Sequence, residues 1–338
     1  MDHDKIRNFV KNYVSNRLRF TEFAITNSCI AKCTFCDIWK QTPKVMVNKE
    51  KAIKAIDKLS SFGVSHLTLT GGEPLLHPNV IEFVERATRN KMHNAVLDAA
   101  PQLLLRNDMV KRLEQAGNDM ISISFDSGDP ETMEASRQIP NIMQDMTKAV
   151  EQIRKTKIAS MASILIWNDN YDKLEVTFQR AVDMGFDVIS LNYPTFSKSQ
   201  VYPLGGEGIS LSKDKVIHGL KESIRIKKTK KFPLINSTYS MQNIIRFLQD
   251  PLTVKSLCRG GNRTLFLDWF LDIHPCMQLP KVLGNMLEME LSDLHTETCN
   301  DCNMSWYRDF SSCFGLGGIP ILLDSIGNIQ PIFSRTNQ

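Results

Sequence analysis

Three cysteines within eight residues are the side chains of this sequence with the clearest chemical potential. Cys29, Cys33 and Cys36 follow a C-x3-C-x2-C spacing, so their thiolates can converge on one inorganic centre. A [4Fe–4S] cluster normally has four cysteine ligands, and three would leave one iron open to a ligand from outside the protein. A zinc ion completed by a nearby His or Asp is the alternative, because paired cysteines in intracellular chains often bind zinc.

A second group of cysteines lies in the C-terminal part of the chain. Cys258, Cys276, Cys299 and Cys302 are enough to complete a metal centre with protein ligands alone, and the last two form a tight C-x2-C pair. Both a structural zinc ribbon and an iron–sulfur cluster agree with this spacing. Cys313 is a fifth cysteine outside this set.

The elements that must position these cysteines alternate between strand and helix. Apolar, β-branched runs are followed by segments with helical periodicity, and the pair recurs every 25 to 35 residues. Such alternation predicts a parallel sheet, and six units are too few for a closed eight-stranded barrel. Strands are expected at 19–26, 65–70, 95–100, 120–126, 160–167 and 187–193, and helices at 49–59, 79–89, 107–116, 142–155 and 171–184.

Two motifs at strand ends resemble those of the radical S-adenosylmethionine (radical SAM) superfamily. The cysteine spacing, with Phe35 at its aromatic position, resembles the cluster-binding loop C-x3-C-x-aromatic-C, and it follows the first strand. Residues 71–74 read Gly-Gly-Glu-Pro after the second strand, as in that family. The resemblance implies an open, partial (β/α)6 TIM barrel over 19–200, with a [4Fe–4S] cluster on the three cysteines and SAM on the open iron.

The resemblance also implies a reaction. An electron from the cluster, supplied by a donor such as flavodoxin or ferredoxin, cleaves SAM to a 5′-deoxyadenosyl radical, which abstracts a substrate hydrogen atom. Gly71 and Gly72 would let the backbone approach SAM closely, because they lack Cβ, and Glu73 would face the methionyl ammonium group. An ordinary turn is the alternative explanation for the glycine pair.

Polar residues at later strand ends are the remaining candidates for SAM contacts. In related enzymes such a residue binds the ribose; Ser124 is the first choice here and Asp126 the second, although a polar strand end can simply satisfy a turn. Asn168 and Asn170 occupy the place where relatives often contact the adenosine. Residues 98–101 depart from the Thr-Asn-Gly that many relatives carry, so no contact is transferred there.

The C-terminal cysteines resemble those of the auxiliary-cluster domains called SPASM and, in shortened form, twitch. This implies an auxiliary [4Fe–4S] cluster that carries electrons, and a layout of an N-terminal helix (1–18), a barrel (19–200), a helical connection (201–250) and an auxiliary-cluster domain (251–338). Cys313 could be a buried small side chain, an alternative ligand or a hydrogen-atom donor to a substrate radical.

The charge composition limits the classes of binding partner to expect. The 338 residues carry 41 basic and 37 acidic side chains, a net charge of +4 that indicates neither nucleic acid nor any other strongly charged partner. The sequence shows no secretory signal and no apolar run near 18 residues, so we expect no membrane span and a cytoplasmic protein.

Three functions agree with these observations. The first is oxidation or epimerisation of a carbon in a small hydroxylated molecule, such as a sugar or aminocyclitol, because one auxiliary cluster resembles the twitch dehydrogenase and epimerase group. The second is modification of a peptide or protein. The third, of a different class, is a zinc-binding interaction protein on an α/β scaffold.

Substitution of one cysteine tests the radical SAM hypothesis. Cys33→Ala should abolish cleavage of SAM by the dithionite-reduced protein, because the cluster loses one of its three ligands. The measurement is the release of 5′-deoxyadenosine, and release at the wild-type rate would contradict the assignment.

Overall fold

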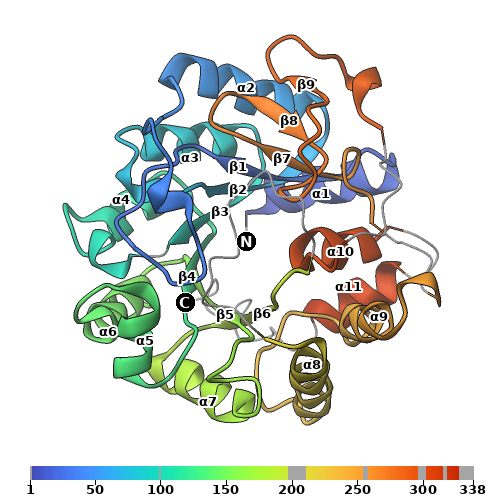
Figure 1. Cartoon of the computed structure of the whole chain (residues 1–338). Helices are drawn as coiled ribbons and strands as arrows, with labels where there is room; N and C mark the ends of the chain where they lie inside the picture. The colour runs from blue at the N-terminus through green and yellow to red at the C-terminus, as the bar shows by residue number, and fades with distance from the viewer. Residues whose placement is uncertain are drawn as a thin grey trace.

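A computed structural model describes residues 2–98, 100–196, 211–253, 258–295, 302–314 and 318–326. Within these ranges one sheet of nine strands runs in the order β6-β5-β4-β3-β2-β1-β7-β8-β9 (Figure 1). The first six strands are parallel, and each pairs with the next one along the chain. They are β1 (Arg19–Ala24), β2 (Val64–Thr70), β3 (His93–Asp98), β4 (Met120–Ser124), β5 (Ala159–Leu165) and β6 (Val188–Asn192).

This arrangement confirms the predicted α/β fold with an open, partial barrel, since β6 forms one edge of the sheet. The intervening helices cover the outside of the curved sheet (Figure 1). Asn48 caps the first of them, accepting a hydrogen bond from the Lys51 backbone N–H at 3.1 Å, as its position before an amphipathic run predicts. These helices are α2 (Lys49–Ser61), α3 (Val80–Arg89), α4 (Met109–Gln115), α6 (Ile142–Ile153), α7 (Leu174–Met184) and α8 (Lys213–Lys228).

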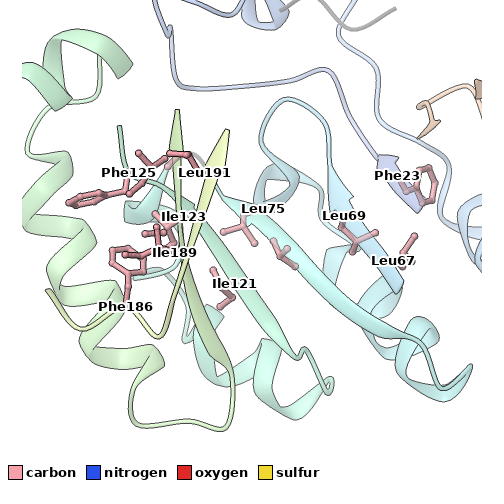
Figure 2. Packing of buried hydrophobic residues seen from close by; sticks show 14 of the residues in the cluster. Phe23, Leu67, Leu69, Leu75, Ile121, Ile123, Phe125, Phe186, Ile189 and Leu191 are labelled. Atoms are coloured by element: carbon pink, nitrogen blue, oxygen red, sulfur yellow. The ribbon is translucent and has the colours of Figure 1, made fainter. Parts of the chain in front are cut away.

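Side chains of the strands alternate between the helices and the inside of the barrel. Ile121 and Ile123 of β4 pack with Ile189 and Leu191 of β6 in one buried cluster with the surrounding helices (Figure 2). Because successive strand residues point to opposite faces, the positions between them face inward. These inward positions of the barrel strands include Glu22, Thr68, Ser122, Ser124, Ser163, Ser190 and Asn192.

The C-terminal strands extend the sheet beyond β1. They form a hairpin: β7 (Thr264–Leu267) and β8 (Asp272–His274) are antiparallel, and β9 (Gly284–Asn285) pairs with β8. The pairing of β7 with β1, parallel, has no signature in the sequence. Helix α5 (Pro130–Arg137) was also not predicted.

Helix α10 (Ser305–Ser312) connects the two sides of the open barrel. The Ser305 hydroxyl donates a hydrogen bond to Asn192 of β6 at 2.9 Å, and the Tyr307 hydroxyl donates one to Glu22 of β1 at 2.9 Å. The ring of Phe310 contacts that of Phe20, with centroids 4.3 Å apart. The helix therefore lies across the gap between β6 and β1 (Figure 1).

The other helices complete the described structure. Helix α1 (His3–Val14) precedes the barrel, and α9 (Thr238–Gln249) and α11 (Gly318–Ile326) belong to the C-terminal part. Across the described ranges, no helix combines the length and apolar character that a membrane crossing requires.

Candidate active site

The cysteine loop (residues 29–36) leaves the C-terminal end of β1 beside the Gly-Gly-Glu-Pro turn. The backbone N–H groups of Gly72 and Glu73 donate hydrogen bonds to the carbonyls of Thr26 and Ser28, each at 2.7 Å. A Cβ on Gly72 would lie 2.1 Å from the Ser28 carbonyl oxygen. The close approach that the glycines permit is thus to the chain that enters the cysteine loop, rather than an open turn.

The three thiols of this loop are brought together and taken out of water. Cys33 is buried, Cys29 and Cys36 are half-buried, and none forms a disulfide. Burial raises the pKa of Cys29 to about 12, helped by the nearby Glu73, and burial raises the pKa of Cys36 to about 11. Buried thiolates need a compensating positive charge, which a metal centre supplies, so the donor set fits the implied cluster.

Among the described residues, no group of three His, Cys, Asp or Glu side chains is close enough to hold one metal ion.

Glu73 lies beside this site. Its side chain is fully buried, its Oε1 accepts a hydrogen bond from the Leu75 N–H at 3.0 Å, and its charge acts on Cys29. The predicted contact with a methionyl ammonium group agrees with this location, and it stays a prediction.

Phe35 packs between two side chains that the sequence did not single out. The Arg137 guanidinium lies 4.9 Å above its ring, and the indole of Trp167 meets it edge-on at 6.3 Å. Arg137 also donates hydrogen bonds to Asp126 (Nε to Oδ2, 2.7 Å) and to the Cys33 sulfur (3.5 Å). The aromatic position of the motif thus anchors the loop to α5 and to the segment that follows β5.

Two of the four predicted polar contacts are engaged within the protein. Asp126 binds Arg137, and its backbone carbonyl accepts hydrogen bonds from the Trp167 indole and the Asn170 amide. The side-chain oxygen of Asn170 also accepts a hydrogen bond from the backbone N–H of Trp167 at 2.9 Å. Ser124 is half-buried, and no side-chain hydrogen bond is found for it in the described part of the chain. Asn168 is equally half-buried, so these two keep their predicted roles as hypotheses.

The C-terminal cysteines lie close to the cysteine loop. Cys258 and Cys276 contact the same apolar cluster, built around Tyr307 and Phe266, that Cys29 and Cys36 touch. The Cys276 sulfur accepts two backbone hydrogen bonds, from Gln278 and Leu279, each at 3.4 Å, which is how a ligating thiolate is stabilised. Cys302 is buried at the start of the α10 segment, whereas Cys299 lies outside the described residues.

Cys313 occupies a different place. It caps the C-terminus of α10, and its sulfur lies 3.9 Å from the Asp309 carbonyl oxygen. The adjacent Phe314 contacts Phe20 near the start of β1, at the opposite end of that strand from the cysteine loop. Cys313 is half-buried at this location, and its three possible roles stay predictions.

Glu22 is a buried carboxyl group on the inner face of β1. It is 6% exposed, and its Oε2 accepts the hydrogen bond from Tyr307. Burial raises its pKa to about 7. A glutamate in the middle of the apolar run 19–25 was the signal that could have identified it.

Comparison with known proteins identifies one domain of the chain. Residues 23–181 match the model of the radical SAM superfamily. The chain contains a radical SAM domain. Accordingly its cofactors are a [4Fe–4S] cluster and SAM.

Two curated relatives align with the radical SAM domain and beyond it. The AdoMet-dependent heme synthase of Methanosarcina barkeri is 24% identical over 304 residues, covering 83% of each chain. The subtilosin biosynthesis protein AlbA of Bacillus subtilis is 22% identical over 276 residues; the match covers 78% of this chain and only 56% of AlbA.

A solved structure shares the fold. SuiB of Streptococcus suis, crystallised with S-adenosylmethionine, superposes with a TM-score of 0.64 at 13% identity, covering 94% of this chain and 75% of SuiB. At this identity the similarity concerns the fold of the radical SAM domain and its C-terminal extension.

Replacing Gly72 tests the contact between the glycine turn and the cysteine loop. Gly72→Ala should displace the Ser28 backbone, lowering the free energy of unfolding by about 1–3 kcal/mol and reducing the iron bound after reconstitution. Gly219→Ala is the milder control, because its Cβ would lie 3.2 Å from the Ile166 side chain and 3.3 Å from the Tyr171 carbonyl oxygen, instead of 2.1 Å from a carbonyl oxygen as at Gly72. Equal iron content and melting temperature in the two variants would contradict this role.

The buried carboxyl group predicts a pH dependence of stability. The pKa of Glu22 is about 7 in the folded protein and near 4.5 in the unfolded chain, so its protonated form stabilises the fold at low pH. This contribution, roughly 1–3 kcal/mol, is lost as pH rises from about 4.5 to 7. Thermal unfolding of Glu22→Gln should therefore vary less with pH than that of the wild type. Parallel curves would show that Glu22 ionises normally.

Proposed function

We propose that the protein uses SAM and its cluster to abstract a hydrogen atom from a small hydroxylated molecule, such as a sugar or aminocyclitol, and to oxidise that carbon. The observation that carries the proposal is the polarity of the inner face of the barrel. Its strands present hydroxyl, carboxyl and amide groups beside apolar side chains such as Leu97 and Met161, so a partly polar molecule matches this face. Ser122 is one example, because its hydroxyl is buried without a hydrogen-bond partner in the described part of the chain.

Each residue of the site would have a distinct role in this reaction. When bound, the cluster and SAM supply a 5′-deoxyadenosyl radical. The three cysteines hold the cluster, Glu73 lies where it would bind the methionyl ammonium group, and Ser124 and Asn168 would contact the nucleoside. Helix α10 covers the open side of the barrel and excludes water from the reacting atoms.

An auxiliary cluster would complete the oxidation. Four protein ligands (Cys258, Cys276, Cys299 and Cys302) leave no site for substrate, so such a cluster accepts the second electron while the substrate hydroxyl loses its proton. The shared apolar cluster around Tyr307 keeps two of these ligands close to the cysteine loop. This supports a SPASM- or twitch-like role for residues 251–338, and it favours oxidation over epimerisation.

Peptide modification is the second candidate. It is favoured by the match to AlbA, a protein of the biosynthesis of the bacteriocin subtilosin. The zinc-binding interaction protein loses its support because residues 23–181 match a radical SAM domain.

The proposed reaction also needs an electron donor and a reducing compartment. An electron carrier such as flavodoxin or ferredoxin would reduce the cluster, and the cytoplasm is the compartment in which such carriers and free thiols coexist. Iron–sulfur clusters that are sensitive to oxygen also require a reducing compartment.

A substrate screen tests the proposed function. Anaerobically reconstituted protein with dithionite and SAM would be offered sugars, aminocyclitols and short peptides in separate panels. We expect a hydroxylated small molecule to raise 5′-deoxyadenosine release at least about tenfold and to be recovered two hydrogens lighter. Stimulation by peptides alone would transfer the assignment to the second candidate.

A further inference from the structure

The last turn of α5 holds the cysteine loop by its backbone. The N–H of Lys32 donates a hydrogen bond to the Arg137 carbonyl at 3.2 Å, and the N–H of Thr34 donates one to the Ser136 carbonyl at 3.0 Å. Carbonyls in the last turn of a helix lack partners within the helix, so they are available for this purpose. The two bonds lie on either side of Cys33 and fix its position.

The Arg137 side chain then reaches the sulfur itself. The residue is 8% exposed, and its Nη1 lies 3.5 Å from the Cys33 sulfur. Phe35 covers the guanidinium on one face, at 4.9 Å. A planar guanidinium with several N–H donors can bind a sulfur and a carboxylate at once, which a lysine ammonium cannot do in the same geometry.

Asp126 holds the guanidinium in place. Its Oδ2 accepts the hydrogen bond from Nε at 2.7 Å, and its Oδ1 accepts one from the Leu165 N–H at 3.3 Å. The carboxylate is itself buried and therefore balances the charge of Arg137. The sulfur thus receives a hydrogen bond from a cation that is largely, but not wholly, neutralised.

We propose that Arg137 is a positioning residue that raises the reduction potential of the SAM-binding cluster through its hydrogen bond to the Cys33 sulfur. Reduction adds negative charge to the cluster, and a cationic donor at a ligand sulfur stabilises the reduced form. Asp126 opposes this effect by its negative charge. The inference needs the cluster on the three cysteines and does not depend on the substrate.

The test is a redox titration followed by electron paramagnetic resonance, on reconstituted full-length protein without SAM. Because the auxiliary cysteines would contribute a second signal, each variant would also carry Cys276→Ala. Arg137→Gln should shift the midpoint potential of the remaining cluster to more negative values, and Arg137→Lys should shift it less. Asp126→Asn should shift it the opposite way, since it leaves the positive charge unbalanced.

The opposite signs of the two shifts distinguish an electrostatic effect on the potential from a disturbed cysteine loop. A disturbed loop would shift the potential in the same direction in Arg137→Gln and Asp126→Asn. Arg86→Gln is the matched control: it removes an Arg–Asp pair, with Asp57, that links α2 and α3 away from the cysteines, and it should leave the potential unchanged. If Arg137→Gln loads no cluster, Arg137→Lys and Asp126→Asn still give the two signs. Unchanged potentials or shifts of one sign would each overturn the proposal.

Discussion

The site depends on a short run of backbone hydrogen bonds between two loops that leave neighbouring strands. Residues 26–28 and 71–73 approach so closely that a side chain on either glycine would collide with a carbonyl oxygen. Parallel strands end at the same edge of a sheet, and this contact locks the two loops together there. The cysteines that follow Ser28 therefore start from a fixed point, which a cluster with three protein ligands requires.

Side chains along each barrel strand alternate between an outward face, which packs against the helices, and an inward face, which lines the candidate site. Outward residues such as Ile121 and Ile123 fill the layer between sheet and helices, while inward residues such as Ser122 and Glu22 stay polar. A buried polar group is costly unless something binds it. Glu22 is bound by Tyr307 and Asn192 by Ser305, whereas the Ser122 hydroxyl has no partner in the described part of the chain and is the group that a bound molecule would satisfy. The apolar cluster around Tyr307 lies between the two groups of cysteines.

Much of this architecture is visible in the sequence, because it rests on local patterns. Six strands, the helices between them and the N-cap at Asn48 follow from periodicity and capping chemistry, and the two motifs identify the radical SAM domain. Contacts between residues far apart in the sequence were not predicted. Asp126 was only the second choice for the ribose contact, and nothing in the sequence connects it with Arg137, eleven positions later on an unpredicted helix. The pairing of β1 with β7 is equally non-local.

That pairing has a consequence for how the chain reaches its folded state. Phe20 lies beside His66 on one side and beside Thr264 on the other, so the strand that carries the cysteine loop acquires its second neighbour only after most of the polypeptide has been made. Until then β1 presents an unprotected row of backbone donors and acceptors, the kind of surface from which aggregation begins. This topology therefore requires that a chaperone or another part of the nascent chain cover the free edge of β1 until β7 has been synthesised.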